Sequence, residues 1–340
     1  MPGSLNRPAG EALRVLLSDV AAARHGARIQ EALPEAALVP VASEGPLPDP
    51  AGAEVAFVTR DLFVGGTRHR LNPRFLRFVE FLKVAPALRW VQTFSAGTDL
   101  VVYQEMLARG LLLTNSAGAS APAVAQTAVT GLLALARQFP RIVEAQRRHA
   151  WEPLYDGEEP REVEGQAALV VGTGPIGQEI GRLCRAFGLR TTGLRRDPAA
   201  GIPPGFDAVA GFAALPDLLP RTDWLILACP LTETTRNLID ARALALLPRG
   251  RHLVNVSRGG VVEEEALLEA LRSGHLAGAF LDVFTQEPLP AGSPFWDLPK
   301  VIVSPHSAAA SDGLPERVAA IFCDNLRRWA KGEALRNLAR

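Results

Sequence analysis

Three side chains suited to acid–base chemistry or anion binding stand just after apolar stretches of the chain. Arg258 follows HLVNVS, Glu287 follows GAFLDVFTQ, and His306 follows VIVSP. A guanidinium can bind a carboxylate through two parallel hydrogen bonds, and an imidazole gains or loses a proton near neutral pH. Glu287 beside His306 would favour the protonated imidazole. Together they predict a site that binds a carboxylate and donates a proton to a neighbouring carbonyl oxygen.

Each of the three has an ordinary explanation when taken alone. Arg258 could form a surface salt bridge, Glu287 could be a solvated loop carboxylate, and a single histidine is more often structural. Their shared position favours the catalytic interpretation, because ligands of parallel α/β sheets bind beyond the carboxyl ends of the strands. Gly259 and Gly260 predict a sharp turn that aims Arg258. The other histidines are interpreted as structural: His25, His69, His149, His252 and His275.

A glycine-rich motif, GTGPIG, lies between an apolar stretch at 167–171 and a helical pattern at 176–187. Glycines allow a tight turn and a close approach of backbone N–H groups to phosphates, and the helix N-terminus adds positive potential. The motif predicts a dinucleotide site, and the alternative is a strand-to-helix turn without a ligand. The expected contacts are Gly172, Gly174, Pro175, Ile176 and Gly177.

Strand and helix patterns alternate along the chain, which predicts an α/β fold with two doubly wound parallel sheets. Strands are expected at 13–17, 55–59, 88–93, 111–114, 167–171, 190–194, 224–228, 252–256, 278–281 and 301–303. A helical pattern at 120–148 would be about 43 Å long and would bridge two domains. A last helix at 314–331 could return to the first domain, which would make that domain discontinuous.

Composition excludes several classes of partner. Lys plus Arg and Asp plus Glu number 36 each, so no net charge attracts nucleic acid or an anionic membrane. Three scattered cysteines in apolar segments indicate buried thiols in a reducing compartment. The chain has neither a signal-peptide pattern nor an apolar run of membrane-spanning length, so we expect a cytoplasmic protein. No His/Cys cluster has metal-ligand spacing, and the Glu263–Glu265 run is interpreted as favourable charge on a first helical turn.

Six stretches, in order over about residues 88–335, resemble the NAD(P)-dependent D-isomer specific 2-hydroxyacid dehydrogenases. They are FSAGTD, GTGPIG, CPLTETTRNLID, VNVSRGGVVEEEALLEAL, GAFLDVFTQEPLP and VSPHSA. The resemblance implies reduction of a small 2-oxo acid, such as glyoxylate or hydroxypyruvate, to the D-2-hydroxy acid. The alternative is a non-catalytic, dinucleotide-sensing regulator or corepressor on the same scaffold, which the presence of all three reactive side chains disfavours. Glu287 also argues against a formate dehydrogenase, where the histidine partner would be a glutamine.

The resemblance also implies roles for individual residues. Arg258 would bind the substrate carboxylate and carbonyl, His306 would be the proton donor, and Glu287 would tune and orient His306. Backbone amides of Ala96 and Gly97 would hold the substrate carboxylate. Asp282 would face the nicotinamide carboxamide, and the remaining cofactor contacts would be Cys229, Pro230, Val256, Ser257, His306 and Ala308.

The family fold implies a smaller, flavodoxin-like substrate domain made of residues 1–114 and 306–340. A Rossmann cofactor domain, 115–305, would be inserted in it and would include the helix at 120–148. The resemblance further implies a homodimer built on that helix. Trp151 would either reach the neighbour's active site or pack in a dimer arm.

Two arginines bear on the choice of cofactor. NAD-preferring members of the family place an aspartate for the ribose hydroxyls eighteen positions beyond Gly177, where this chain has Arg195, followed by Arg196. Guanidinium groups attract a 2′-phosphate, whereas a carboxylate repels it. The sequence therefore predicts NADP(H) as the preferred cofactor, with NAD(H) possible if Asp197 bends back toward the ribose.

Overall fold

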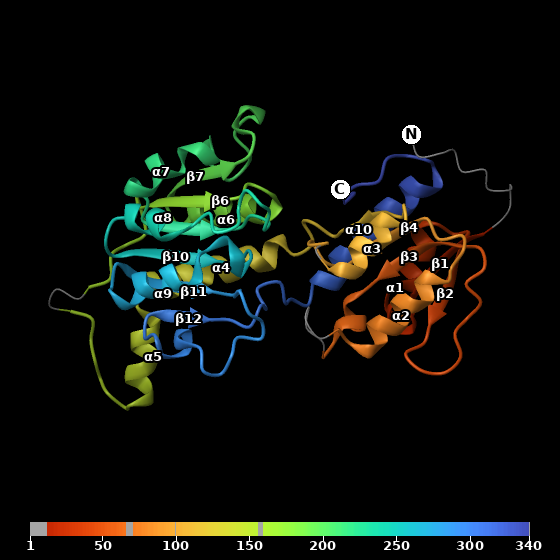
Figure 1. Cartoon of the computed structure of the whole chain (residues 1–340), viewed down its shortest axis with the longest axis horizontal. Helices are drawn as coiled ribbons and strands as arrows, with labels where there is room; N and C mark the ends of the chain where they lie inside the picture. Colours follow the sequence, from red (N-terminus) through yellow and green to blue (C-terminus); the bar gives the residue numbers. More distant parts are fainter. Residues whose placement is uncertain (1–11, 66–70, 99, 156–158, 340) are drawn as a thin grey trace. The chain divides into compact units, whose positions relative to one another are not determined.

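A computed structural model describes residues 12–65, 71–98, 100–155 and 159–339 of the chain. The chain divides into two compact units: unit 1 comprises residues 1–120 and 311–340, and unit 2 comprises residues 121–310 (Figure 1). Each unit is an α/β structure around its own parallel sheet. The predicted fold class, with two parallel-sheet units, is confirmed.

Unit 1 contains a five-stranded parallel sheet in the order β2-β1-β3-β4-β5, a flavodoxin-like order. Its strands are β1 (Leu13–Ser18), β2 (Ala36–Val41), β3 (Ala53–Val58), β4 (Trp90–Thr93) and β5 (Leu112–Thr114). Apolar residues alternate along β1, so that Leu13, Val15 and Leu17 pack in one core and Leu16 packs in the other. The sheet is therefore buried on both faces.

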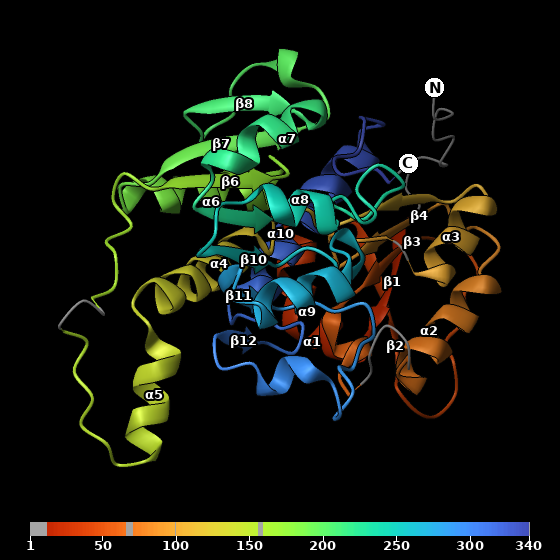
Figure 2. The same ribbon diagram turned by 60° about the vertical axis from the view of Figure 1, so that its left-hand side comes forward.

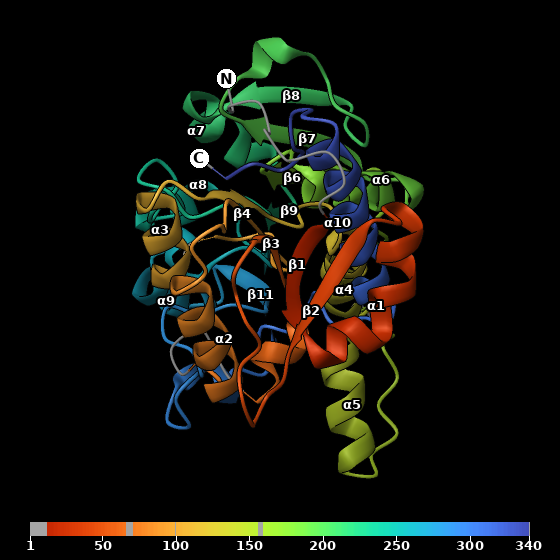
Figure 3. The same cartoon turned by 90° about the vertical axis from the view of Figure 1, so that its right-hand side faces the viewer.

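Two helices cover each face of this sheet, as Figure 3 shows. On one side lie α1 (Asp19–Ala32) and α10 (Leu314–Ala330), and on the other lie α2 (Pro73–Lys83) and α3 (Val101–Ala108). Phe322 of α10 stacks on Phe57 of β3 with ring centroids 4.1 Å apart. The last helix thus completes a core whose strands come from the first third of the chain.

Unit 2 contains a seven-stranded parallel sheet in the order β12-β11-β10-β9-β6-β7-β8. Its strands are β6 (Ala167–Val171), β7 (Arg190–Arg195), β8 (Ala208–Gly211), β9 (Trp224–Leu227), β10 (Arg251–Asn255), β11 (Leu276–Leu281) and β12 (Val301–Val303). Figure 2 shows β6, β7 and β8 side by side. From β6, the strands β7 and β8 are added on one side of the sheet, and β9 to β12 are added on the other. Dinucleotides bind in Rossmann folds at this point, where the order of the strands reverses.

Helices again cover both faces of the sheet. Helices α4 (Ala121–Ala136) and α6 (Pro175–Ala186) share one core with the sheet. The short helices α7 (Leu215–Leu218) and α8 (Ala241–Leu246), together with α9 (Glu264–Arg272), share the other. Across the described residues, no helix combines the length and the apolar composition that a membrane crossing requires.

The predicted single helix at 120–148 is wrong. Helix α4 ends at Ala136, and a separate helix, α5 (Phe139–Arg147), follows it. Gln138 between them has a left-handed backbone with φ of 55°. Pro140 has no N–H to donate to the carbonyl of Ala136, and its ring would clash with that carbonyl in a continuous helix. The proline therefore divides the pattern, although the apolar residues continue through it.

Candidate functional site

The three predicted reactive side chains lie at one edge of the unit 2 sheet. Strands β10, β11 and β12 are parallel neighbours, so that their carboxyl ends meet at the same edge. Arg258 lies three residues beyond β10, Glu287 lies six beyond β11, and His306 lies three beyond β12. The topology places the loops that carry these residues next to each other.

His306 and Glu287 form a hydrogen-bonded pair. His306 Nδ1 lies 2.8 Å from Glu287 Oε2, and the other carboxylate oxygen of Glu287 accepts a hydrogen bond from Phe284 N at 3.1 Å. An ionised carboxylate only accepts, so Nδ1 carries the hydrogen of this bond. Nε2 is then the ring nitrogen that can exchange a proton with a ligand. The His306 side chain is 41% exposed, and that of Glu287 is 15% exposed.

Asp282 organises the loop that carries His306. It follows β11, is 2% exposed, and accepts hydrogen bonds from Ser304 Oγ at 2.6 Å, Ser307 N at 2.8 Å and Ala308 N at 3.1 Å. The backbone N–H of His306 donates to the carbonyl oxygen of Asp282 at 2.8 Å. His306 has a φ of 51°, which is uncommon for a residue with a side chain and needs such support.

The turn that carries Arg258 is held by Asn255, a buried residue at the end of β10. Asn255 Oδ1 accepts hydrogen bonds from Ser257 N at 3.0 Å and Ser257 Oγ at 2.8 Å, and its amide donates to the carbonyl of Arg258 at 3.2 Å. Arg258 Nη1 donates to Ser257 O at 2.7 Å. We did not single out Asn255 in the sequence. Its signal was an amide side chain at a strand end, directly before the reactive turn.

Gly259 lets the Arg258 turn contact the loop that leads to Glu287. A Cβ atom on Gly259 would lie 2.0 Å from Phe284 C and 2.3 Å from Thr285 N. The backbone does turn directly after Arg258, in a 3-10 turn at Gly259–Val261, but neither glycine has a positive φ. Gly259 is also needed for a close approach of two backbones.

The loop before Glu287 has a second anchor on α9. Glu264 Oε2 accepts a hydrogen bond from Thr285 N at 3.1 Å, and Glu263 Oε2 accepts one from Ala241 N at 3.2 Å. The sequence interpretation of this acidic run as helix-terminal charge did not include these contacts. Two of its three glutamates thus also tie neighbouring segments to the start of α9.

The glycine-rich motif forms the turn between β6 and α6. Gly172 has a φ of 102°, and a Cβ on Gly177 would lie 1.9 Å from Gly172 O. Gly174 caps α6, and a Cβ there would meet nothing within 4 Å. Gly172 and Gly177 are therefore required by the turn itself, whereas Gly174 borders open space at a helix N-terminus. This arrangement fits the diphosphate of a dinucleotide.

The predicted walls of the cofactor site are mostly buried. Cys229, Val256, Ser257 and Ala308 are each less than 9% exposed, and Pro230 is exposed beside Cys229. Burial raises the pKa of the Cys229 thiol to about 11, so this group stays neutral near pH 7. Asp282 turns its carboxylate to the 304–308 loop. Its contact with a nicotinamide carboxamide, like the other cofactor contacts, stays a prediction.

The residues expected to select the cofactor lie at the end of β7. Arg195 is half-buried and its Nη1 lies 3.5 Å from Gly201 O, while Arg196 is exposed. Asp197 accepts a hydrogen bond from Ala199 N at 3.1 Å and caps the turn 198–200. The carboxylate of Asp197 is thus engaged within its own loop.

Three predicted substrate-site or dimer residues belong to other segments of the chain. Ala96 and Gly97 belong to the unit 1 loop after β4, and no acceptor for their N–H groups occurs in the described part of the chain. Trp151 follows α5 and is 96% exposed. Its exposure is compatible with both roles proposed for it.

The other histidines lie outside the candidate site or outside the described residues. His252 lies near the start of β10, at the end of the strand opposite to the candidate site. Its ring stacks on that of Trp224 with centroids 4.3 Å apart, and burial lowers the pKa of His252 to about 4. His25 is buried in unit 1, and His275 lies 2.9 Å from Leu244 O. His69 falls outside the described residues. Within those residues, no group of three or more His, Cys, Asp or Glu side chains is arranged to hold a metal ion.

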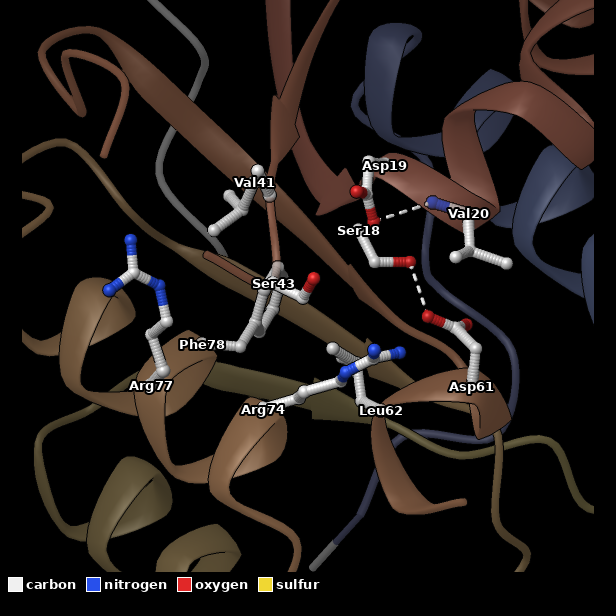
Figure 4. A pocket seen from close by; sticks show the side chains of 11 residues that line it. Ser18, Asp19, Val20, Val41, Ser43, Asp61, Leu62, Arg74, Arg77 and Phe78 are labelled. Atoms are coloured by element: carbon white, nitrogen blue, oxygen red, sulfur yellow. Dashed lines mark hydrogen bonds between the residues drawn. The ribbon is translucent and has the colours of Figure 1, made fainter. Parts of the chain in front are cut away.

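A small pocket in unit 1 is too small for a substrate. It lies at the ends of β1 and β2, where Ser18 Oγ donates to Asp61 Oδ2 at 2.6 Å (Figure 4). Its volume of about 10 Å³ is near the minimum that a single water molecule needs. None of the predicted site residues lines it.

Comparisons with known proteins agree with this geometry. A family model described as the NAD binding domain of D-isomer specific 2-hydroxyacid dehydrogenases matches residues 129–308. A glyoxylate reductase from Korarchaeum cryptofilum is 36% identical over 275 residues, which cover 76% of this chain and 78% of that protein.

Two solved structures resemble the whole chain. A D-isomer specific 2-hydroxyacid dehydrogenase from Xanthobacter autotrophicus Py2, in complex with NADPH and MES, is 30% identical with a TM-score of 0.76, covering 97% of this chain and 98% of that one. An NADPH-dependent glyoxylate/hydroxypyruvate reductase from Sinorhizobium meliloti, in complex with NADP and sulfate, is 25% identical with a TM-score of 0.74. That match covers 96% of this chain and 98% of the other.

The close approach at Gly259 leads to a test of how the site is held together. We expect Gly259→Ala to lower the free energy of unfolding by about 1–3 kcal/mol, because the new methyl group would displace backbone atoms of Phe284 and Thr285. Gly260→Ala is the matched control, since its Cβ would meet the Leu231 side chain at 3.2 Å. Urea unfolding measures both, and equal losses in the two variants would contradict the assignment.

Proposed function

Because the chain belongs to the D-isomer specific 2-hydroxyacid dehydrogenase family, we propose that it reduces a small 2-oxo acid to the D-2-hydroxy acid. Glyoxylate and hydroxypyruvate are the substrates we propose. The observation that carries the proposal is the His306–Glu287 pair beside the Arg258 turn. The glycine-rich turn 172–177, which we propose holds a nicotinamide dinucleotide, follows β6 of the same sheet.

In the proposed mechanism, a bound reduced nicotinamide supplies the hydride that the keto carbon accepts. Arg258 binds the substrate carboxylate through its guanidinium, which fixes the keto group relative to His306. His306 Nε2 donates a proton to the carbonyl oxygen, so that the carbonyl becomes a hydroxyl. Glu287 holds Nδ1 and stabilises the imidazolium before the transfer, and the exposed ring then regains a proton from water.

The same proposal assigns the remaining roles to the two predicted domains. Residues 1–114 and 306–340 form the substrate domain, in which the N–H groups of Ala96 and Gly97 donate to the substrate carboxylate. Residues 115–305 form the cofactor domain, and His306 and Ala308 in the loop that follows add further cofactor contacts. The turn 172–177 and the N-terminus of α6 would hold the diphosphate. A cytoplasmic location, expected from the sequence, stays a prediction.

We propose NADP(H) as the preferred cofactor. Arg195 and Arg196 at the end of β7 offer two guanidinium groups where a 2′-phosphate would lie. The hydrogen bond of Asp197 to Ala199 N argues against the alternative in which Asp197 binds the ribose. NAD(H) could still be used with lower efficiency, since the diphosphate site does not depend on the arginines.

We also propose that the protein is a homodimer in which α5 packs on a second copy. Phe139, Ile142 and Val143 of α5 are 52%, 41% and 39% exposed, which is unusual for three apolar residues on one short helix. Phe139 and Val143 line an open groove of about 1210 Å³ that is also lined by half-exposed Trp296. A second copy of this apolar surface would cover both features.

The enzymatic proposal is tested by NADPH oxidation with a panel of 2-oxo acids. We expect turnover with glyoxylate or hydroxypyruvate, and a loss of about 10²–10⁴-fold in kcat for His306→Ala, because general acid catalysis contributes about that much. NADPH binding, measured by fluorescence, should persist in that variant. His275→Ala is the control and should retain its activity. A wild-type protein that binds NADPH but reduces none of these acids would support the regulator instead.

Cofactor preference is tested by the double variant Arg195→Ser/Arg196→Ser. The ratio of kcat/KM for NADPH to that for NADH should fall by about 10–100-fold, since hydrogen bonds to charged groups contribute about 1.5–3 kcal/mol each. Arg190→Ser, at the opposite end of β7, serves as the control and should leave the ratio unchanged. Tighter use of NADH than NADPH by the wild type would refute the preference.

The dimer is tested by sedimentation velocity. We expect a species of twice the chain mass of 36.3 kDa, and a monomer for Phe139→Glu/Val143→Glu, because buried carboxylates would oppose the contact. Val84→Glu, which replaces another exposed apolar residue, should remain dimeric. A monomeric wild type at micromolar concentration would contradict the proposal.

A further inference from the structure

A fully buried polar cluster lies in unit 1 behind the loop of Ala96 and Gly97. Its four side chains come from β4, β5, the segment after β5, and α10, and each is at most 1% exposed: Gln92, Thr114, Ser116 and Asn325. Buried polar groups are costly unless their donors and acceptors are paired. The positions of these groups are therefore strongly coupled to one another.

Gln92 is the centre of the cluster. Its Oε1 accepts hydrogen bonds from Thr114 Oγ1 at 2.7 Å and Asn325 Nδ2 at 3.0 Å. Its Nε2 donates to Asn115 O and Ser116 Oγ, both at 3.1 Å. The amide has two donor hydrogens and two acceptor lone pairs, and all four are used. Its orientation is thereby determined.

Asn325 connects this centre to the C-terminal segment. Its Nδ2 also donates to Arg336 O at 3.1 Å, and its Oδ1 accepts from Arg336 N at 2.8 Å. The segment then runs beside β5, where Ala339 N donates to Leu113 O at 2.8 Å. One side chain on α10 thus holds the chain's last residues and the amide of Gln92 together.

Ser116 connects the cluster to the substrate loop. Its Oγ donates to Thr93 O at 2.8 Å, and its N–H donates to Ser95 O at 2.9 Å. The carbonyl of Ser95 and the N–H of Ala96 belong to one planar trans peptide and point in opposite directions. The bond to Ser95 O therefore sets the direction of the Ala96 N–H. Ser95 Oγ donates to Gly97 O at 2.6 Å and restrains the next part of the loop.

We propose that Asn325 is a positioning residue for the substrate carboxylate, acting through Gln92 and Ser116 on the N–H groups of Ala96 and Gly97. The C-terminal segment is then part of the machinery for substrate binding, although it contacts no reacting atom. This inference rests on the proposed function, because it assumes that those N–H groups bind a 2-oxo acid. It extends that function to a residue more than two hundred positions from the loop.

Asn325→Leu tests the inference because it keeps the branched shape of the side chain and removes every hydrogen bond that the side chain makes. We expect the KM for glyoxylate to rise about tenfold, equivalent to about 1.4 kcal/mol, with a smaller change in kcat. The KM for NADPH should not change, since the proposed dinucleotide contacts all lie in unit 2. Ser116→Ala, a milder variant that retains the backbone bond to Ser95, should raise the same KM about threefold.

Two controls separate positioning from stability. Ile29→Ala removes a fully buried side chain from the same unit without touching the cluster, so it should lower the melting temperature but leave KM unchanged. Arg336→Ala should leave KM unchanged, because only the backbone of Arg336 contacts Asn325. It should lower the melting temperature only slightly, since the side chain forms a surface ion pair with Asp324 at 3.3 Å. A destabilised Asn325→Leu protein with wild-type KM for glyoxylate would overturn the inference.

Hydrogen exchange at residues 95–97 distinguishes a failure of the proposed role of Asn325 from a failure of the proposed function. Faster exchange there in Asn325→Leu, but not in Ile29→Ala, would support the link from Asn325 to the loop. If the wild-type protein then reduced no 2-oxo acid, the proposed function would fail while the link held. Unchanged exchange together with wild-type turnover would refute the link itself.

Discussion

The buried carboxylate of Asp282 is the constraint on which the candidate site depends. A buried carboxylate requires hydrogen-bond donors, and those of the Asp282 side chain come from the single loop 304–308. Because that loop must close on Asp282, His306 takes a left-handed backbone and comes within 2.8 Å of Glu287. The position of the His306–Glu287 pair therefore depends on the hydrogen bonds of one carboxylate at the end of β11.

Much of the fold and the position of the site could be predicted from the sequence. Strands of parallel sheets are often continuous apolar runs, and two such runs, β6 and β12, begin and end as predicted. Once the strand ends were known, the meeting of Arg258, Glu287 and His306 at one sheet edge followed from topology. The GTGPIG motif likewise required only local reasoning, since its strand, turn and helix are contiguous.

Other features could not be predicted, for identifiable reasons. Edge strands β2 and β8 were not predicted: β2 (AALVPV) contains Pro40, which a strand interior seldom tolerates, and β8 (AVAG) is only four residues long and ends in glycine. The break at Gln138 was hidden by apolar residues on both sides of Pro140. Three further residues act through contacts with distant segments or with backbone atoms: Asn255, Gly259 and Asn325. Such contacts cannot be predicted from the spacing of residues in the sequence.

The contribution of α10 to unit 1 has a consequence for biosynthesis. During translation, residues 121–310 emerge as one uninterrupted stretch, so unit 2 can fold as soon as it leaves the ribosome. The earlier strands of unit 1 must wait for Phe322 and Asn325, which complete their core and their polar cluster. The nascent chain thus carries an unfinished sheet through most of its synthesis, and a ribosome stalled before α10 would display its apolar face to chaperones.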